Sequence, residues 1–581
     1  MNKAFIFCLA CLFLTLSVKS QTDNNAATIV IEATIVDSKT KEPIPYATIV
    51  SPKNNKGTMT NLEGYFVFPG LAPQDSLWIS YVGYGRITIN VDSIDKTIEL
   101  VSKTEILREA HIFYKTPFLY DLIAKSKKTI SRESLKAKTY FELQTKVNDK
   151  QVELLECYFN GTFRGYDVKD LRLKNGRIAL SEAEGSVFIS IETSKVLNMH
   201  KVFWQNEYFP ESPFELRSKK LKKAYNLKMA STFINEKTGA NYYIIEFRPK
   251  KNPDNYFEGE AWIDAKTGNI LKIDYRIKNA VNHPFLPIKS TDTLLHVDME
   301  ISKTFIEKGG YMYVNNIDFK YDLRYKNELG LAYDVSSFAV LNAYDYKQLF
   351  DIPIFETLEG AGDYVLIKSM PYNDFFWQNI DEFRLNDRRN KNEIFRRLYA
   401  KYDTKDIANY PPTAQSFFLD PIYVSWSENR FMSTQKLFRG YRYKPPNGEP
   451  WDMMNIEIQF YLDVNKINGK ISHISKVMYD PFESFYHYPL DKDFMLFLNI
   501  YMDLLEIERR KFDAEANQLT EIIFIQELYK KQIVKNEALR QKYFRETDRG
   551  NNTEQLKLWS EYTLQELGVD NWAIFENFEV K

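Results

Sequence analysis

Cysteine is nearly absent from this chain of 581 residues, and its three cysteines exclude a disulfide framework. Cys8 and Cys11 lie in the apolar run that begins the chain, so a mature protein without that run retains Cys157 alone. Cys157 is then a lone cysteine in the run Leu154-Leu155-Glu156-Cys157-Tyr158, and we expect a small buried residue there and not a nucleophile.

Neither sign of charge dominates the chain. Lys and Arg number 77, Asp and Glu number 78, and the formal net charge is −1. A general nucleic-acid partner would favour a strongly basic face, so this balance argues against nucleic acid. Long apolar runs are also missing after the N-terminus, and we therefore predict no transmembrane helix in the mature chain, since such a helix needs about 20 apolar residues.

The common catalytic motifs are missing as well. The chain contains no His-Glu-x-x-His, no Cys-x-x-Cys, no Walker loop, no Gly-x-Gly-x-x-Gly and no Gly-x-Ser-x-Gly. No two of its six histidines have helical metal-ligand spacing, and His473 and His487 would meet only across a hairpin. We predict no cofactor and no metal site.

Two groups of residues remain as candidates for acid/base chemistry. Asp480, Glu483 and His487 share one aromatic-rich loop, where a carboxylate and an imidazole can exchange protons. A second group has carboxylates near aromatic residues, as a glycosidase needs, and consists of Asp374, Asp381 and Glu382. Such groupings arise by chance in a chain with 78 acids. We predict a protein without catalysis, with Asp480, Glu483 and His487 as the catalytic candidates if it is an enzyme.

The N-terminus has the pattern of an export signal. Met1-Asn2-Lys3 is a short basic segment, and the apolar run that follows, Ala4 to Leu16, is too short to span a bilayer. Val18-Lys19-Ser20 offers small residues at the positions that a signal peptidase reads, and cleavage there would leave Gln21 as the new N-terminus. We expect an exported protein, located in the periplasm or associated with the outer membrane.

The segment from Val36 to Leu100 predicts a small β-sandwich. Short β-branched and aromatic runs are separated by turn residues every 8 to 12 positions. Gly57 and Gly64 fall where tight turns with positive φ are expected. The runs and turns that carry the pattern are Val36-Asp37, Pro43 to Ile49, Gly64-Tyr65-Phe66, Leu77 to Tyr84 and Ile98-Glu99-Leu100.

In order and spacing these runs resemble the carboxypeptidase regulatory-like domain, a transthyretin-like sandwich that is common at the N-termini of cell-envelope proteins in Bacteroidota-type bacteria. Ser80-Tyr81-Val82-Gly83-Tyr84 matches the most specific motif of that family. In true carboxypeptidases the zinc site lies in a separate catalytic domain. The resemblance therefore implies a stabilising or binding module, without peptidase activity.

The middle of the chain predicts an antiparallel sheet. A helix is expected in the segment Phe118 to Leu135, where apolar residues follow helical spacing. Hairpins are expected at Asn148-Asp149-Lys150 and at Ala265 to Asn269, and two further strands at Tyr311 to Leu323 and Ala332 to Leu341.

One motif of this sheet, Gly-x-x-Trp-Ile-Asp-x-x-Thr-Gly-x-Ile-x-x-Ile from Gly259 to Ile273, resembles the curved sheet of lipoprotein-carrier-like periplasmic domains. Such a half-barrel holds an acyl chain in its concavity or is filled by its own core. We favour the filled core.

The last third predicts strands and helices. Ile456 to Val464 and Ile471 to Met478 alternate around a turn, which predicts a hairpin. Asp491 to about Thr547 has a continuous apolar face of helical spacing, and Thr553 is the expected cap of a final short helix.

The predicted fold is thus mainly β with α+β parts: an N-terminal seven-stranded-type β-sandwich, a central curved antiparallel sheet, and a C-terminal region with strands and a helical segment. The predicted boundaries are 1–20 for the signal peptide, 28–103 for the sandwich, 104–345 for the central domain, 346–490 for a mixed β and loop region, and 491–581 for the helical region.

These observations favour a non-catalytic envelope protein that binds or scaffolds an envelope protein, a glycan or a lipid. Two alternatives stay open at this point. An exported hydrolase of glycans or peptides would have its site between Tyr410 and His487, and a periplasmic carrier of lipid or lipoprotein would use the central sheet.

Overall fold

The computed structural model describes residues 29–53, 56–61, 63–103, 105–106, 116–180, 182–183, 186–187, 193–234, 239–287, 289–357, 361–380, 383, 385, 422–426, 454–467, 469–481, 483–484 and 491–576. The predicted signal peptide lies outside these residues. Within them, no helix has the length and apolar character to cross a membrane. The chain divides into two compact units, the first made mainly of residues up to Val101 and the second mainly of residues from Ser102 onward.

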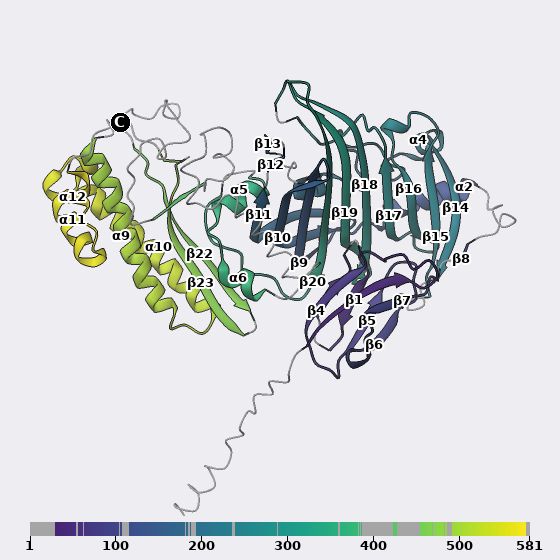
Figure 1. The fold of residues 1–581 in the computed structure, drawn as a ribbon, viewed down its shortest axis with the longest axis horizontal. Helices are drawn as coiled ribbons and strands as arrows, with labels where there is room; N and C mark the ends of the chain where they lie inside the picture. Colours follow the sequence, from purple (N-terminus) through teal and green to yellow (C-terminus); the bar gives the residue numbers. More distant parts are fainter. Residues whose placement is uncertain are drawn as a thin grey trace, which may run out of the picture. The chain divides into compact units, whose positions relative to one another are not determined.

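The first unit contains seven strands in two sheets (Figure 1), as the sequence predicts. One sheet has the order β4-β1-β7 and the other the order β3-β2-β5-β6. Apolar side chains from both sheets are fully buried, among them Ile35, Ile49, Phe66, Ile79 and Leu100. The strands are β1 (Ile29–Asp37), β2 (Thr48–Ser51), β3 (Lys56–Met59), β4 (Tyr65–Leu71), β5 (Ser76–Ser80), β6 (Ile87–Asn90) and β7 (Thr97–Leu100).

The two glycines that were expected in turns behave differently. Gly64 has φ +71, and a Cβ there would lie 2.5 Å from the carbonyl oxygen of Ile35, so the turn before β4 requires glycine. The prediction of positive φ at Gly57 is wrong, because Gly57 lies within β3 and pairs with Val50 of β2 in an ordinary antiparallel ladder.

The second unit is built on an antiparallel sheet of eleven strands, in the order β11-β10-β9-β20-β19-β18-β17-β16-β15-β14-β8 (Figure 1). Most neighbours are joined by hairpins, but β20 returns to pair with β9. The strands are β8 (Glu105–Ile106), β9 (Ser134–Val147), β10 (Lys150–Arg164), β11 (Asp167–Leu180), β14 (Tyr225–Ile234), β15 (Asn241–Pro249), β16 (Glu258–Asp264), β17 (Ile270–Ile277), β18 (Thr293–Lys308), β19 (Tyr311–Lys326) and β20 (Ala332–Asp345).

The predicted hairpins of this sheet are confirmed. Asn148 and Asp149 both have positive φ, at +47 and +64, which is the geometry of a two-residue turn between β9 and β10. Gly268 has φ +82 in the turn between β16 and β17. The helix predicted to reach Leu135 is shorter, since α2 (Thr116–Ser126) ends earlier and Leu135 already belongs to β9.

One face of this sheet is covered by a large apolar core. Helices α2, α3 (Thr193–Met199) and α4 (Ser218–Ala224) contribute to it, together with an aromatic segment between α3 and α4. That segment places Phe203, Phe209 and Phe214 against sheet residues. The buried apolar side chains on this face thus belong to one continuous core.

A charged side chain lies inside this core. Lys303 of β18 has no exposed surface, and its Nζ donates a hydrogen bond of 2.8 Å to the carbonyl oxygen of His200. Burial lowers the pKa of Lys303 to about 8, an effect that Asp167 opposes and Lys201 adds to.

We expect Lys303→Met to stabilise the protein by about 2 kcal/mol at pH 7. The variant no longer buries a charged ammonium group, but it also loses the hydrogen bond to His200, which offsets part of the gain. The folded-state pKa of Lys303 lies below its unfolded value, so the wild type should gain stability as the pH rises from about 8 towards 10.5, and the variant should lack this gain. Urea unfolding at pH 7, 9 and 10 measures the difference between the two proteins, and a difference that does not shrink with pH would contradict the assignment.

The C-terminal part of the second unit combines a small sheet with helices. The sheet has the order β21-β23-β22, and Figure 1 shows α9 and α10 running side by side next to it. The elements are α5 (Asp363–Ser369), α6 (Asp374–Asn379), β21 (Val424–Ser425), β22 (Ile458–Ile467), β23 (Lys470–Tyr479), α9 (Lys492–Ala516), α10 (Ile522–Glu546), α11 (Thr553–Leu567) and α12 (Asn571–Phe575).

The predicted hairpin of β22 and β23 is confirmed, and the predicted long helix is divided. The helical pattern expected up to Thr547 is two helices, because the chain leaves the helix after Ala516 and restarts at Ile522. Thr553 begins α11 but does not cap it, since the side chain of Asn552 accepts the hydrogen bond from the Gln555 amide.

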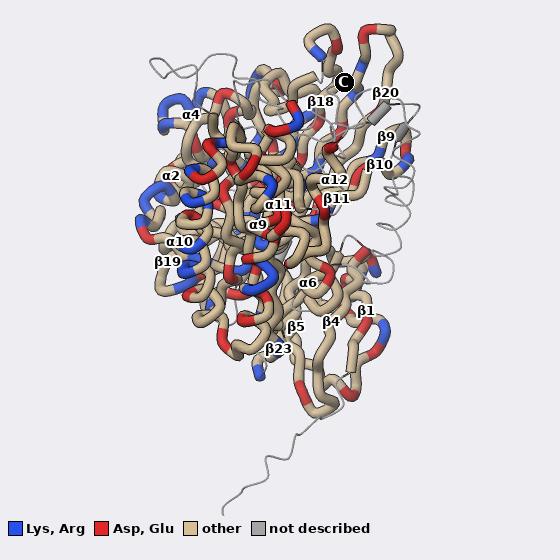
Figure 2. The backbone as a smooth tube through the Cα atoms, turned by 90° about the vertical axis from the view of Figure 1, so that its left-hand side faces the viewer, with Lys and Arg blue, Asp and Glu red and all other residues tan. Residues whose placement is uncertain are grey.

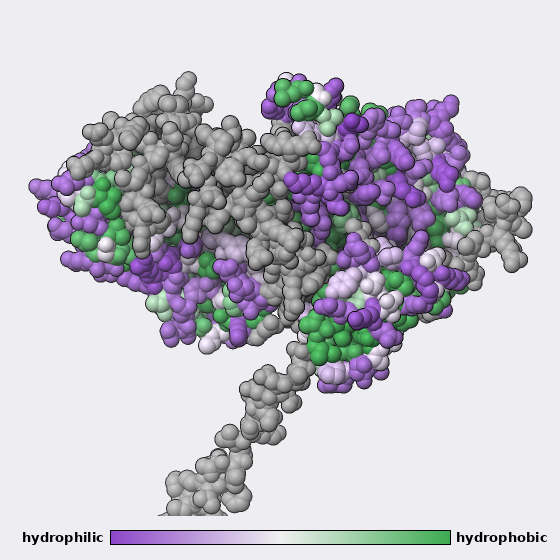
Figure 3. Space-filling model, viewed as in Figure 1, coloured by the Kyte–Doolittle hydropathy of each residue, from purple (hydrophilic) through white to green (hydrophobic). Residues whose placement is uncertain are grey.

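The surface agrees with the balanced charge of the sequence. Figure 2 shows Lys and Arg interspersed with Asp and Glu along most of the described backbone, with a basic run at α4. On the face seen in Figure 3, hydrophilic residues predominate over the part of the large sheet that contains β14 to β18.

Candidate binding site

A pocket of about 490 Å³ lies in the C-terminal part of the second unit. It is formed by β22 and the two residues before it, by β23, α9 and α10, and by the segment 354–356. Its lining is Ile354, Phe355, Glu356, Ile456, Glu457, Ile458, Gln459, Phe460, Val477, Tyr501, Leu505, Tyr529, Ile533, Asn536, Glu537 and Arg540.

The alternation of β22 divides this lining into two sides. Ile456 and Phe460 belong to the same buried cluster as residues of α9 and α10, and Ile458 packs against that cluster. Glu457 and Gln459 alternate with them, and the amide of Glu356 donates to Gln459 Oε1 at 2.9 Å. β22 and the residues before it therefore present apolar side chains towards α9 and α10, and Glu457 and Gln459 on the opposite side.

The pocket holds more acid than base. Arg540 donates to Glu537 Oε2 at 2.9 Å, so these two charges pair with each other. Neither Glu356 nor Glu457 forms an ion pair with any residue that the structure describes. Burial and the neighbouring Glu356 carboxylate raise the pKa of Glu457, while Arg540 opposes this shift.

Two of the predicted catalytic candidates lie beside this pocket. Asp480 is 2% exposed, and its carboxylate accepts the Glu483 amide at 3.1 Å and the Gln459 side-chain amide at 3.4 Å. Its backbone amide donates to the carbonyl oxygen of Glu457. Asp480 thus fixes the turn after β23 and supports the pocket wall through Gln459. The third candidate, His487, lies outside the described residues.

The glycosidase-like group is not assembled among the described residues. Asp374 lies exposed in the first turn of α6, where a carboxylate is stabilised by the helix dipole, and Asn373 caps that helix. Asp381 and Glu382 fall outside the described residues.

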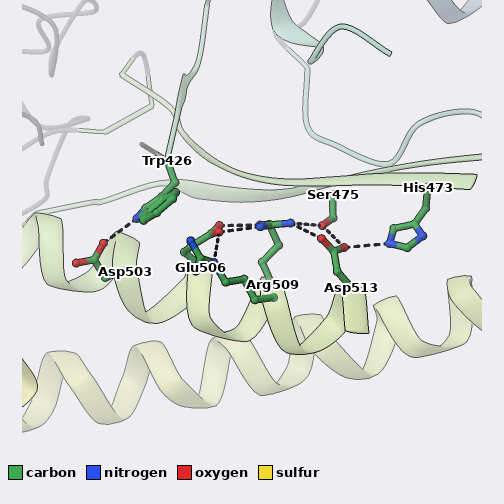
Figure 4. A network of polar contacts seen from close by, with 8 residues as sticks. Trp426, His473, Ser475, Asp503, Glu506, Arg509 and Asp513 are labelled. Carbon is green, nitrogen blue, oxygen red and sulfur yellow. Dashed lines mark hydrogen bonds and ion pairs between the residues drawn. The ribbon is translucent and has the colours of Figure 1, made fainter. Parts of the chain in front are cut away.

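A second polar cluster joins α9 to β23 (Figure 4). His473 Nε2 lies 3.0 Å from Asp513 Oδ1, and Ser475 Oγ donates to the same oxygen at 2.6 Å. Arg509 contacts the other carboxylate oxygen of Asp513 and also bonds Glu506. Nearer the start of α9, Asp503 accepts a hydrogen bond of 2.7 Å from the indole of Trp426.

This cluster contains the residue types of a hydrolase triad in the wrong arrangement. The Ser475 hydroxyl bonds the carboxylate of Asp513 instead of the imidazole, so no base is in place to activate it. Burial works against the charged form of Asp513, but His473, Ser475 and Arg509 together hold its pKa below the ordinary value. The geometry is that of an ionised carboxylate that ties a helix to a strand.

The described residues contain no group of three or more His, Cys, Asp or Glu side chains placed to hold a metal ion. Cys157 is fully buried, and burial raises the pKa of its thiol well above the ordinary value. A buried neutral thiol is a poor nucleophile.

Residues 31–112 match the family model of the CarboxypepD_reg-like domain. The match falls on the predicted sandwich and extends to residue 112. No curated protein matches the chain significantly.

Solved structures give distant similarities. A LolA superfamily protein from Nitrosomonas europaea is 10% identical, with a TM-score of 0.15 over 39% of this chain and 93% of that chain. A putative outer membrane lipoprotein-sorting protein domain from Vibrio parahaemolyticus is 10% identical, with a TM-score of 0.17 over 40% and 93%. The MucA/MucB complex of Pseudomonas aeruginosa is 11% identical, with a TM-score of 0.14 over 39% of this chain and 92% of that chain. At these TM-scores the similarities assign neither a ligand nor a partner.

The sequence-based reasoning missed the pocket because its residues are far apart in the chain. Glu356, Glu457 and Arg540 come from three segments that no local pattern connects. One signal was present in α10, where Tyr529, Ile533 and Arg540 lie on one helical face that mixes apolar and charged residues.

Proposed function

We propose that this chain is an exported, non-catalytic binding protein of the bacterial cell envelope, and that it holds its partner in the pocket beside β22. The observation that carries the proposal is the pocket itself, a concave site with an apolar wall and a few convergent polar groups. The N-terminal basic and apolar pattern and the CarboxypepD_reg-like match support the compartment.

A binding role suits the residues better than hydrolysis. Asp480 and Glu483 belong to one turn, and the carboxylate of Asp480 is engaged by amide donors. Hydrolysis would need a base aimed at a nucleophile or water, whereas Ser475, His473 and Asp513 all serve one ion-pair network.

We expect Ile533→Arg to weaken partner binding by about tenfold or more, because this half-exposed residue of α10 lines the pocket and a guanidinium would fill its apolar side. Val534 is the matched control, since it is the next residue of the same helix, is 71% exposed and does not line the pocket. Tagged full-length proteins are purified from envelope fractions of the native host, and co-eluting molecules are quantified by mass spectrometry.

The expected result is a component that co-elutes with the wild type and with Val534→Arg and falls by about tenfold or more with Ile533→Arg, which corresponds to about 1.4 kcal/mol of binding free energy. An empty wild-type protein, or equal recovery by Ile533→Arg, would contradict the proposal.

A further inference from the structure

Among the described strands, the one that borders the pocket lies at an edge of its sheet. In the order β21-β23-β22, β22 lies at the end of the sheet. On the side of β22 that faces away from β23, one described residue pairs with the strand. This residue is Ile354, which exchanges two backbone hydrogen bonds with Leu462, of 2.8 and 3.2 Å. After Ile354 this segment diverges, and the Glu356 amide bonds the Gln459 side chain instead of the strand.

The direction of the backbone groups on β22 follows from these bonds. Leu462 directs its N–H and C=O away from β23, and backbone directions alternate along a strand, so Phe460 and Ile458 do the same. The bonds of β23 support this direction. Val477 is the partner of Phe460, and its carbonyl accepts a hydrogen bond from the Trp426 amide on the side of β23 that faces away from β22.

These groups are largely unused. The carbonyl of Phe460 accepts the Tyr529 hydroxyl at 2.8 Å. The N–H of Phe460 and both backbone groups of Ile458 have no hydrogen-bond partner on this side among the residues that the structure describes. Unpaired groups on a strand edge are a template for another strand.

The two sides of the edge require different side chains from such a strand. Towards α9 and α10, Ile456, Ile458 and Phe460 present an apolar surface. On the other side, Glu356 and Glu457 have no ion pair within the described chain and attract positive charge. Side chains of an added strand alternate between these sides.

We propose that the pocket binds an extended peptide segment with alternating apolar and basic residues, which adds as a strand to the edge of β22. This inference rests on the proposed binding function and names its partner chemistry. Main-chain hydrogen bonds to Ile458 and Phe460 supply affinity, and the alternating side chains supply specificity. The carboxylates of Glu356 and Glu457 select Lys or Arg on the acidic side.

The probe is a fluorescein-labelled decapeptide of alternating Lys and Val, with capped ends, and its control replaces every Lys by Glu. Fluorescence anisotropy with the full-length protein should show binding of the Lys peptide at least about tenfold tighter than the Glu peptide, because opposite charges attract and like charges repel. Equal binding of the two peptides would overturn the charge assignment.

Backbone methylation tests the strand addition without altering the protein. In an extended peptide the N–H groups of alternate residues face opposite edges, so only one set faces β22. Methylation of the amides of one set, either all Lys or all Val, should weaken binding by about tenfold, and methylation of the other set should have little effect. Equal effects of both sets would overturn the inference.

Ile458→Pro tests the same contact from the protein side. Proline removes an N–H that faces the open edge and leaves the bonds to β23 intact, and edge strands accept proline. It should lower affinity for the Lys peptide by about tenfold, with Ile458→Val as control and circular dichroism to confirm folding.

The two proposals fail in different ways. If Ile533→Arg loses the envelope partner while Ile458→Pro binds the Lys peptide as the wild type does, strand addition is overturned and the binding function stands. If Ile533→Arg keeps both the partner and the peptide, the pocket is not the site and both are overturned.

Discussion

Replacement of Lys174 by Met is expected to lower the free energy of unfolding of the second unit by about 3 to 5 kcal/mol. Lys174 of β11 is 1% exposed, and its ammonium group contacts Asp463 of β22, which has no exposed surface. It also donates to the carbonyl oxygens of Asp351 and Val464 at 2.6 and 2.9 Å. Met leaves a buried carboxylate without its cation.

The partner substitution distinguishes a lost charge from lost packing. Asp463 Oδ2 also accepts from Asn373 and Asn465, at 2.7 and 3.2 Å. Asp463→Asn removes the charge and keeps an acceptor, so the double variant Lys174→Met with Asp463→Asn should recover about 2 kcal/mol relative to Lys174→Met alone.

Urea unfolding followed by tryptophan fluorescence measures these changes. Lys320→Met is the control, because Lys320 and Asp322 form a half-exposed pair 3.3 Å apart, and its loss should change stability by about 0.5 kcal/mol or less. A double variant less stable than Lys174→Met would contradict the assigned role of the pair.

Gly259→Ala is expected to destabilise the second unit by about 3 kcal/mol or more. Gly259 of β16 has φ +157, and a Cβ there would lie 1.8 Å from the carbonyl oxygen of Asp274 in β17. That oxygen belongs to the paired strand and has no room to retreat, so the ladder between β16 and β17 must open.

Gly310→Ala is the control that separates the effect of the close contact at Gly259 from the effect of a positive φ. It has φ +84 in the turn between β18 and β19, and a Cβ at this position would have no described atom within 4 Å. Gly310→Ala should therefore cost only about 1 to 2 kcal/mol, from the positive φ alone. Thermal melts of both variants provide the comparison, and equal losses would show that the close approach at Gly259 has no effect.

Local patterns in the sequence account for much of the fold. Alternation together with turn residues predicted the hairpins at Asn148-Asp149 and Thr267-Gly268, because strand pairing across a short turn is a local property. The same reasoning was wrong at Gly57, where a glycine inside a strand has no distinguishing local sign.

The candidate site was less accessible to sequence reasoning. A loop that gathers Asp480, Glu483 and His487 suggests chemistry by composition, whereas the pocket depends on Glu356, Glu457 and α10 meeting in space. Lys174 illustrates the same limit, since nothing near it in the sequence indicates a buried partner 289 residues later. Long-range pairing is not encoded in any local period.

The return of β20 to β9 has a consequence for biosynthesis. The hydrogen bond between Thr145 and Ser337 joins residues 192 positions apart, so β9 is made long before its second neighbour exists. At a synthesis rate of about 5 to 20 residues per second, this interval is roughly 10 to 40 s. During that time the edge of β9 that later pairs with β20 is unpaired in the nascent chain, and we expect a chaperone to be needed until β20 is made.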